Sequence, residues 1–257
     1  MAFELSVNLE YGFTEAGDKI EDRIAAAAAA GFTKVELFLL KGRDLAAIKE
    51  ALDANGVQLV STVADYVTQL VDPATHDGFC DVFREAAAAA KSLGCSNVVV
   101  TSGRGVPWLK RPVQLGIFAD ALRKIVPIAE ELDVTILLES ANTRHDHPGV
   151  LCSTTHDSVV VADMVDSPRV KVLYDLYHSV VEGEDPETAL AAAMHQVVHV
   201  QIADAPGRGE PGSGDIDWPG ALAMFERVGY RGMVGIECQP RGTSAQALAY
   251  IQRLCAA

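Results

Sequence analysis

The chain of 257 residues lacks the usual signs of a disulfide-stabilised or thiolate-metal protein. Its cysteines are odd in number and form no CxxC pair, so neither a disulfide framework nor a thiolate metal site is indicated. They are Cys80, Cys95, Cys152, Cys238 and Cys255. Free thiols of this kind fit a reducing compartment, and we expect a cytoplasmic protein.

Basic residues and long apolar runs are also scarce. Lys and Arg number 21 against 35 Asp and Glu, and the net charge of −14 repels phosphate backbones, so nucleic acid is a poor partner. The N-terminus has no basic region ahead of an apolar stretch, which does not fit a signal peptide. The alanine run at residues 25–30 is far shorter than the roughly 20 apolar residues that span a bilayer, so no membrane partner is expected.

What the chain does contain is a regular alternation of two patterns. Apolar, β-branched runs predict strands at residues 3–9, 34–39, 58–63, 97–101, 134–140, 170–174, 197–202 and 233–238. Segments of helical period, rich in Ala and Leu, predict helices at residues 19–30, 44–55, 78–93, 112–132, 156–165, 186–195, 219–228 and 244–254. Gly31, Gly56, Gly94 and Gly229 follow predicted helices, as C-capping glycines do.

Strict alternation of strand and helix predicts a parallel sheet, and eight units favour a closed (β/α)8 TIM barrel. Such barrels usually have about 250 residues, so we expect one domain over residues 1–257. An open Rossmann-like sheet is the alternative. It is disfavoured because no GxGxxG follows the first strand.

Four predicted strands in the second half end on an oxygen-bearing side chain. TILLES reaches Glu139, KVLYD reaches Asp175, VVHVQ reaches Gln201 and MVGIE reaches Glu237. Parallel strands in a barrel would bring these ends to one point, where unpaired buried carboxylates are costly without a cation. Three carboxylates and one carboxamide oxygen suit Mg²⁺ or Mn²⁺, and the charges leave room for one divalent ion per chain.

Several other residues have open roles. Asn8 and Glu36 end the first two strands and are equally suited to substrate contact or to structure, whereas His199 should lie one layer deeper than Gln201. Trp108 suits either the wall of a pocket or the surface, and Trp218 is expected to anchor the loop before it.

These segments carry a family resemblance. HVQIADAPGRGEPGSGDIDW from His199, with LLESANTR, YDLYH and GIECQP, resembles the hydroxypyruvate isomerase family of xylose-isomerase-like TIM barrels. The resemblance implies metal ligation by Glu139, Asp175, Gln201 and Glu237, with the two glutamates as the acid/base pair, and implies that His178 and Arg208 face the substrate. The chain departs from the family pattern at Ser140 and Ala141, and in residues 64–78, where GDW and GERG elements are absent.

The chemistry expected is proton transfer next to a carbonyl. A divalent ion stabilises the enediolate, so that a carboxylate can act as base. Return of the proton to the neighbouring carbon gives isomerisation, such as hydroxypyruvate to tartronate semialdehyde. Return to the same carbon gives epimerisation, so a ketose 3-epimerase or an inosose-type isomerase or dehydratase remains an alternative, with a non-catalytic sugar-acid binder less favoured. Arg208 is expected to bind a carboxylate or a polyol of the substrate, and a homo-oligomer is left open.

Overall fold

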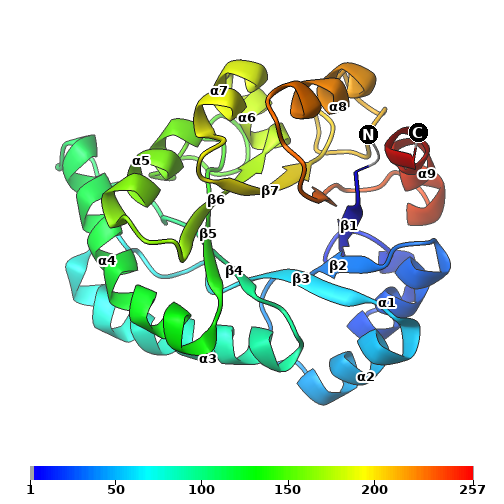
Figure 1. Ribbon diagram of the computed structural model, residues 1–257, viewed down its shortest axis with the longest axis horizontal. Helices are drawn as coiled ribbons and strands as arrows, with labels where there is room; N and C mark the ends of the chain where they lie inside the picture. The colour runs from blue at the N-terminus through cyan, green and yellow to red at the C-terminus, as the bar shows by residue number, and fades with distance from the viewer. Residues whose placement is uncertain (1–2, 257) are drawn as a thin grey trace.

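The computed structural model describes residues 3–256, in which eight parallel strands close into a barrel in sequence order (Figure 1). The strands are β1 (Leu5–Asn8), β2 (Lys34–Glu36), β3 (Gln58–Val63), β4 (Asn97–Val100), β5 (Thr135–Glu139), β6 (Val170–Asp175), β7 (Val197–Ile202) and β8 (Val234–Ile236). β1 pairs with both β2 and β8, which closes the sheet. The predicted TIM barrel is therefore confirmed.

Helices surround the barrel (Figure 1). They are α1 (Ile20–Ala29), α2 (Leu45–Asn55), α3 (His76–Ser92), α4 (Arg111–Leu132), α5 (Thr155–Val165), α6 (Leu176–Glu182), α7 (Pro186–Ala193), α8 (Trp218–Arg227) and α9 (Ser244–Ala256), with 3-10 turns at Thr14–Ala16 and Pro73–Thr75. The four predicted C-capping glycines all adopt positive φ, from 64° at Gly56 to 91° at Gly31. Their position after the helices is confirmed.

Helix α6 was not among the predicted helices. It begins directly at the end of β6, where Asp175 serves as the N-cap and its Oδ1 accepts hydrogen bonds from the backbone N–H groups of Tyr177 (2.8 Å) and His178 (3.4 Å). No loop separates strand from helix, so no turn residue marks the boundary in the sequence. The consequence is a fixed relation between Asp175 and His178, three residues further on.

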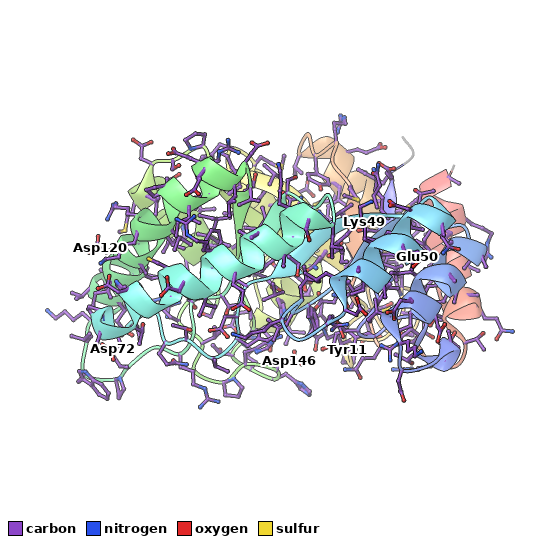
Figure 2. The ribbon with its side chains drawn as sticks, turned by 90° about the horizontal axis from the view of Figure 1, so that it is seen from below. Tyr11, Lys49, Glu50, Asp72, Asp120 and Asp146 are labelled. Carbon is purple, nitrogen blue, oxygen red and sulfur yellow. The ribbon has the colours of Figure 1, made fainter. Side chains whose placement is uncertain are left out.

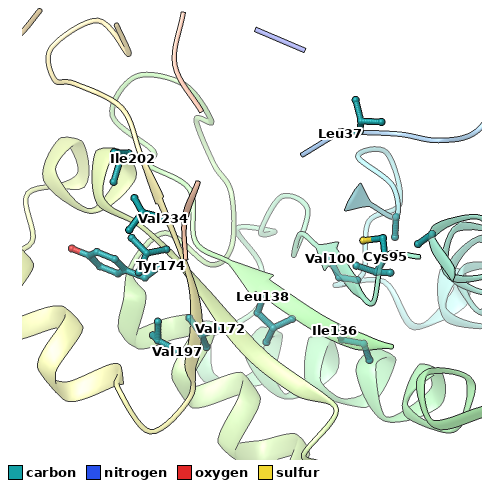
Figure 3. Packing of buried hydrophobic residues seen from close by; sticks show 14 of the residues in the cluster. Leu37, Cys95, Val100, Ile136, Leu138, Val172, Tyr174, Val197, Ile202 and Val234 are labelled. Atoms are coloured by element: carbon teal, nitrogen blue, oxygen red, sulfur yellow. The ribbon is translucent and has the colours of Figure 1, made fainter. Parts of the chain in front are cut away.

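The main hydrophobic core lies between the outer face of the barrel and the helices. Side chains two residues apart on a strand, such as Ile136 and Leu138 on β5 or Val172 and Tyr174 on β6, follow one another along this face (Figure 3). Because strand side chains alternate, the residues between them point into the barrel. Glu139 shares its direction with Leu137, and this places its carboxylate on the inner side.

Half of the barrel interior is apolar and half is polar. Val63, Val99, Leu137 and Leu173 form a small cluster of their own. Opposite them, the buried carboxylate of Glu36 accepts hydrogen bonds from Ser6 (2.5 Å), Ser61 (2.9 Å) and Gln201 (2.7 Å), and lies 3.0 Å from His199 Nε2.

Gly235 makes room for this polar cluster. A Cβ there would come within 2.1 Å of Glu36 Oε1 and 3.1 Å of His199 Nε2, so only glycine fits. Both oxygens of the Glu36 carboxylate are thus hydrogen-bonded inside the barrel, below the strand ends. Of the two roles considered for Glu36, the structure supports the structural role. Within residues 3–256, no helix has both the length and the apolar character needed to cross a membrane.

Candidate active site

A cavity of about 480 Å³ opens at the carboxyl ends of the strands, the face where enzymes of this architecture place their active sites. Its lining includes Asn8, Glu139, Gln201 and Glu237 from the strand ends, together with side chains from the loops that follow. Figure 2, a side view, shows Tyr11 and Asp146, two of the loop residues that line it, toward the same end of the barrel. All but one of the predicted site residues line this cavity, and the exception, Asp175, lies beside it.

Glu139 and Asp175 form the acidic part of the site. Their strands are neighbours, with Glu139 paired to Leu173, two residues before Asp175. Burial, and then the charge of Asp175, raise the pKa of Glu139 to about 8. Burial likewise raises the pKa of Asp175. The Glu139 carboxylate makes no hydrogen bond within residues 3–256, and the charge of Arg208 only partly offsets the rise in its pKa.

His178 faces both of these carboxylates. Its Nε2 lies 3.7 Å from Glu139 Oε1 and 3.7 Å from Asp175 Oδ2, and has no hydrogen-bond partner in residues 3–256. Burial, followed by the charge of Arg208, lowers the pKa of His178 well below 6.5, so the ring is neutral. A neutral ring carries one proton, and which nitrogen holds it decides what the residue can do.

Asn142 determines which nitrogen of His178 carries the proton. Its Oδ1 accepts from the backbone N–H groups of His145 and Asp146, both at 3.0 Å, so its Nδ2 must face the other way. Nδ2 lies 2.7 Å from His178 Nδ1, and the Asn142 backbone N–H donates to the same nitrogen at 3.3 Å. Since Nδ1 receives these donors, the proton is on Nε2. His178 therefore presents an N–H donor to the cavity.

Gln201 and Glu237 occupy the opposite side. Gln201 Nε2 donates to Glu36 at 2.7 Å and to Glu237 Oε2 at 3.0 Å, and Asn8 Nδ2 donates to that same oxygen at 3.2 Å. With both amide protons committed, Gln201 Oε1 is buried and has no hydrogen-bond partner within residues 3–256. Burial raises the pKa of Glu237, and the Arg208 guanidinium opposes that rise.

Arg208 lies over Glu237 and pairs with its Oε1 through Nη2. The guanidinium is buried between the rings of Tyr11 and Tyr177, at 5.6 and 5.3 Å from their centroids, an arrangement that favours a cation. Its Nε–H has no partner in the described residues. The expectation that Arg208 reaches the site agrees with this geometry, although its charge is already matched by Glu237.

The glycine-rich loop that carries Arg208 is organised by Asp204, which is fully buried. Its carboxylate accepts from the backbone N–H groups of Gly212 (2.7 Å) and Ile216 (3.1 Å) and from Trp218 Nε1 (2.8 Å). The expected anchoring role of Trp218 is thus seen in the structure. Gly214 packs so tightly here that a Cβ would lie 2.5 Å from the Ala205 carbonyl oxygen.

The donor set fits a hard divalent cation. Glu139, Asp175 and His178 place potential ligand atoms within 4.8 Å of one another. The Nε2 proton of His178 argues against that nitrogen as a ligand, whereas the unpartnered Gln201 Oε1 is an oxygen of the kind that Mg²⁺ and Mn²⁺ prefer. Glu237 lies outside this group and, like Gln201, lines the opposite side of the same cavity. The carboxylates of Glu139 and Asp175, with a Gln201 carbonyl oxygen that has no hydrogen-bond partner in residues 3–256, are the features that a bound cation would satisfy.

Several residues that line the cavity were not predicted from the sequence. Tyr11, Phe38 and Tyr66 form an aromatic wall, with ring centroids 5.6 and 5.8 Å apart in edge-on contacts. His147 also lines the cavity, with its ring centroid 5.4 Å from that of His178. Trp108 is 77% exposed and does not line the cavity, so of its two roles the surface one is found.

A closed parallel barrel with acidic side chains gathered in a cavity at its carboxyl ends defines a TIM-barrel protein with an enzyme-like site. A family model described as xylose isomerase-like TIM barrel matches residues 24–254. The chain therefore belongs to that family.

Individual proteins similar to this chain support the same family membership. A 2-oxo-tetronate isomerase of Cupriavidus necator is 31% identical over 233 residues, covering 87% of this chain and 89% of that protein. A hydroxypyruvate isomerase of Escherichia coli is 28% identical over 237 residues, covering 89% and 91%. A crystal structure described as an AP endonuclease, family 2, from Brucella melitensis is similar with a TM-score of 0.87 at 27% identity, and the match covers 98% of both chains.

The resemblance to hydroxypyruvate isomerases is thereby confirmed, as is the prediction of an isomerase enzyme. The family acts on small molecules, in keeping with a cavity of about 480 Å³.

Proposed function

We propose that the protein isomerises a small hydroxy-carbonyl acid, of the type hydroxypyruvate to tartronate semialdehyde, by moving a proton between neighbouring carbons. The observation that carries this proposal is the pair of glutamates, partly buried Glu139 and buried Glu237, that line one cavity at the ends of strands β5 and β8. A carboxyl group whose pKa has been raised toward neutrality can take a proton and give it back, which is what general acid/base catalysis requires.

One divalent ion, Mg²⁺ or Mn²⁺, would be held by the oxygens of Glu139, Asp175, Gln201 and Glu237. Support comes from Gln201 Oε1, which has no hydrogen-bond partner in the described residues, and from Glu139 and Asp175, whose ligand atoms lie within 4.8 Å of one another. When bound, such an ion supplies positive charge that polarises a carbonyl and stabilises negative charge on its oxygen.

The side chains would then divide the remaining work. One glutamate removes the proton next to the carbonyl and the other returns a proton to the adjacent carbon. The Nε2–H of His178 donates to the substrate oxygen that becomes negatively charged. The free Nε–H of Arg208 donates to a second substrate oxygen, while the bond of Arg208 to Glu237 keeps that carboxylate oriented.

The substrate class follows from the relatives named hydroxypyruvate isomerase and 2-oxo-tetronate isomerase, whose names denote small oxo acids. A cavity of about 480 Å³ accommodates molecules of this size. The net charge of −14 and the carboxylates of the cavity do not favour DNA as a substrate.

Incubation in D₂O tests the proposal. The protein, loaded with Mg²⁺ or Mn²⁺, is given hydroxypyruvate, other 2-oxo acids or ketoses, and the products are followed by proton NMR. Deuterium at the neighbouring carbon, with tartronate semialdehyde formed, supports the isomerase. Deuterium at the original carbon with inverted configuration would identify an epimerase, and no exchange with any compound would point to a binding protein.

A further inference from the structure

Few cations face the cavity, although the substrate proposed above is an anion. Among the lining residues, the arginines are Arg104 and Arg208, and no lysine is present. Arg208 is already paired with Glu237. Burial, followed by the charge of Arg208, lowers the pKa values of His147 and His178, so these rings add no positive charge near neutral pH. Among the described residues that line the cavity, this leaves Arg104 as the side-chain cation without a charged partner.

The backbone of Arg104 is held from both sides. Its N–H donates to Gln69 Oε1 at 2.9 Å, and it forms an antiparallel bridge with Val150. On either side of it, the Gly105 N–H donates to the Gly149 carbonyl at 2.9 Å and the Gly103 carbonyl accepts from Leu151 at 2.9 Å. Three loops, those following β3, β4 and β5, therefore meet at this residue.

Gly103 makes this junction feasible. Its φ of 70° is left-handed, and a Cβ would lie 3.1 Å from the Thr68 carbonyl oxygen and 3.3 Å from Gln69 Oε1. A side chain at residue 103 would push apart the loops that fix Arg104. Hydrogen bonds to two neighbouring loops therefore fix the backbone at Arg104, although this residue lies in a loop itself.

The side chain of Arg104 contrasts with its backbone. The guanidinium is exposed at the cavity and makes no hydrogen bond or ion pair within residues 3–256. Other exposed arginines of this acidic chain form ion pairs. Arg84 pairs with Glu131 at 2.8 Å, and Arg227 pairs with Glu187 at 2.8 Å. A planar cation without a partner, on a fixed backbone at the mouth of an acid-lined cavity, is matched to an incoming carboxylate.

We propose that Arg104 binds the carboxylate of the substrate and thereby selects acids over neutral ketoses. This proposal rests on the proposed function for the identity of the substrate. Asp146 also lines the cavity, and its carboxylate repels an anion, so an acid needs a local counter-charge. The far end of the molecule would be held by Arg104, while the carbonyl and hydroxyl groups face the strand ends.

Hydroxypyruvate and dihydroxyacetone give a matched pair of test substrates, because they differ only by a carboxylate in place of a hydroxymethyl group. Arg104→Ala should lower kcat/KM for hydroxypyruvate by about 10- to 100-fold, mainly through KM, since a hydrogen bond to a charged group is lost. The value for dihydroxyacetone should stay within about threefold. Arg104→Lys should lie in between, because it keeps the charge and loses the bidentate geometry.

Arg144→Ala is the control. Arg144 is also an exposed arginine in a loop at the same end of the barrel, but it does not line the cavity, so its removal makes the same change in net charge. Both substrates should retain their wild-type constants. Equal losses for hydroxypyruvate and dihydroxyacetone in Arg104→Ala would overturn the proposal, because they would mean that Arg104 only supports the loops.

Calorimetric titration with glycolate, with ethylene glycol as its neutral counterpart, separates this proposal from the proposed function. Binding of glycolate that is weakened in Arg104→Ala but kept in Arg144→Ala supports the carboxylate site even if the wild type turns over neither substrate. Glycolate binding that is equal in the wild type and Arg104→Ala overturns the site, even if the wild type is an active isomerase.

Discussion

Removal of divalent ions should make the stability of this protein depend on pH in a direction opposite to ordinary acid denaturation. Glu139 has a pKa raised to about 8 by burial and by Asp175. Because the folded state holds its proton more tightly than the unfolded state, the neutral carboxyl contributes stability that is complete below about pH 4.5. That stability is lost as the pH rises toward 8.

The magnitude follows from the same shift. A rise from 4.5 to about 8 corresponds to about 4–5 kcal/mol, at about 1.36 kcal/mol for each pH unit. Glu237 and Asp175, whose pKa values are also raised by burial, act in the same direction. His178 acts in the opposite direction at pH below 6.5, because burial and Arg208 lower its pKa and the folded state excludes its proton.

The contribution of Glu139 is isolated by comparing the wild type with Glu139→Gln. Urea unfolding of both proteins in the presence of chelator, from pH 5 to pH 9, should show the wild type losing about 4 kcal/mol relative to the variant. Since His178 is present in both, its effect cancels. A difference that stays constant over this range would refute the reasoning.

Added Mg²⁺ or Mn²⁺ should reverse the trend in the wild type. The ion binds the ionised carboxylates, so its stabilising effect should grow with pH, reaching about 2.7 kcal/mol at a concentration one hundred times the Kd. The variant should gain less. An unchanged melting temperature on chelation, with full turnover retained, would show that the ligand set of Glu139, Asp175, Gln201 and Glu237 is wrong.

Other predictions concern turnover. Glu139→Gln and Glu237→Gln should each reduce kcat by about 10²–10⁴-fold with the fold retained, and metal content measured on both variants separates lost base from lost ion. Arg208→Ala should reduce kcat/KM about tenfold or more for hydroxypyruvate and dihydroxyacetone alike, because the substitution removes a hydrogen-bond donor and leaves Glu237 without its ion pair. A loss confined to hydroxypyruvate would instead support the carboxylate-binding role predicted from the sequence. Asn142→Asp should place an acceptor opposite His178 Nδ1, move the ring proton from Nε2 to Nδ1 and lower kcat about tenfold. Nitrogen-15 NMR of the His178 ring shows which nitrogen carries the proton. An unchanged tautomer with wild-type kcat would contradict the assignment.

The strand ends could be predicted because two independent patterns coincide in the sequence. An apolar run fixes the strand, and the alternation of side chains then fixes the direction of its last residue. Glu139 follows Leu137 on the inner face, and Gln201 follows His199 in the same way, with His199 one layer deeper as expected. The convergence of these residues needed only the parallel closed barrel, which strict alternation of strands and helices indicates.

The loop residues could not be predicted in this way. Asn142 acts through two backbone N–H groups of its own loop, and its contact with His178 spans 36 residues in sequence. Tyr11 and Tyr66 line the same cavity from the loops after β1 and β3 and have no periodicity that relates them. Loop conformation depends on local turns and on contacts between distant segments, and a single sequence displays neither directly.

The uneven interior of the barrel suggests different tasks for the two glutamates. Glu139 lies beyond the apolar side chains of Leu137 and Leu173 and makes no hydrogen bond within the described residues. Glu237 is held by Arg208 and by the amides of Asn8 and Gln201, which themselves belong to the polar half of the barrel. Three donors therefore orient Glu237, whereas no hydrogen bond within the described residues restrains Glu139. On this ground we propose that Glu139 removes the first proton, with Glu237 as the oriented partner that completes the transfer.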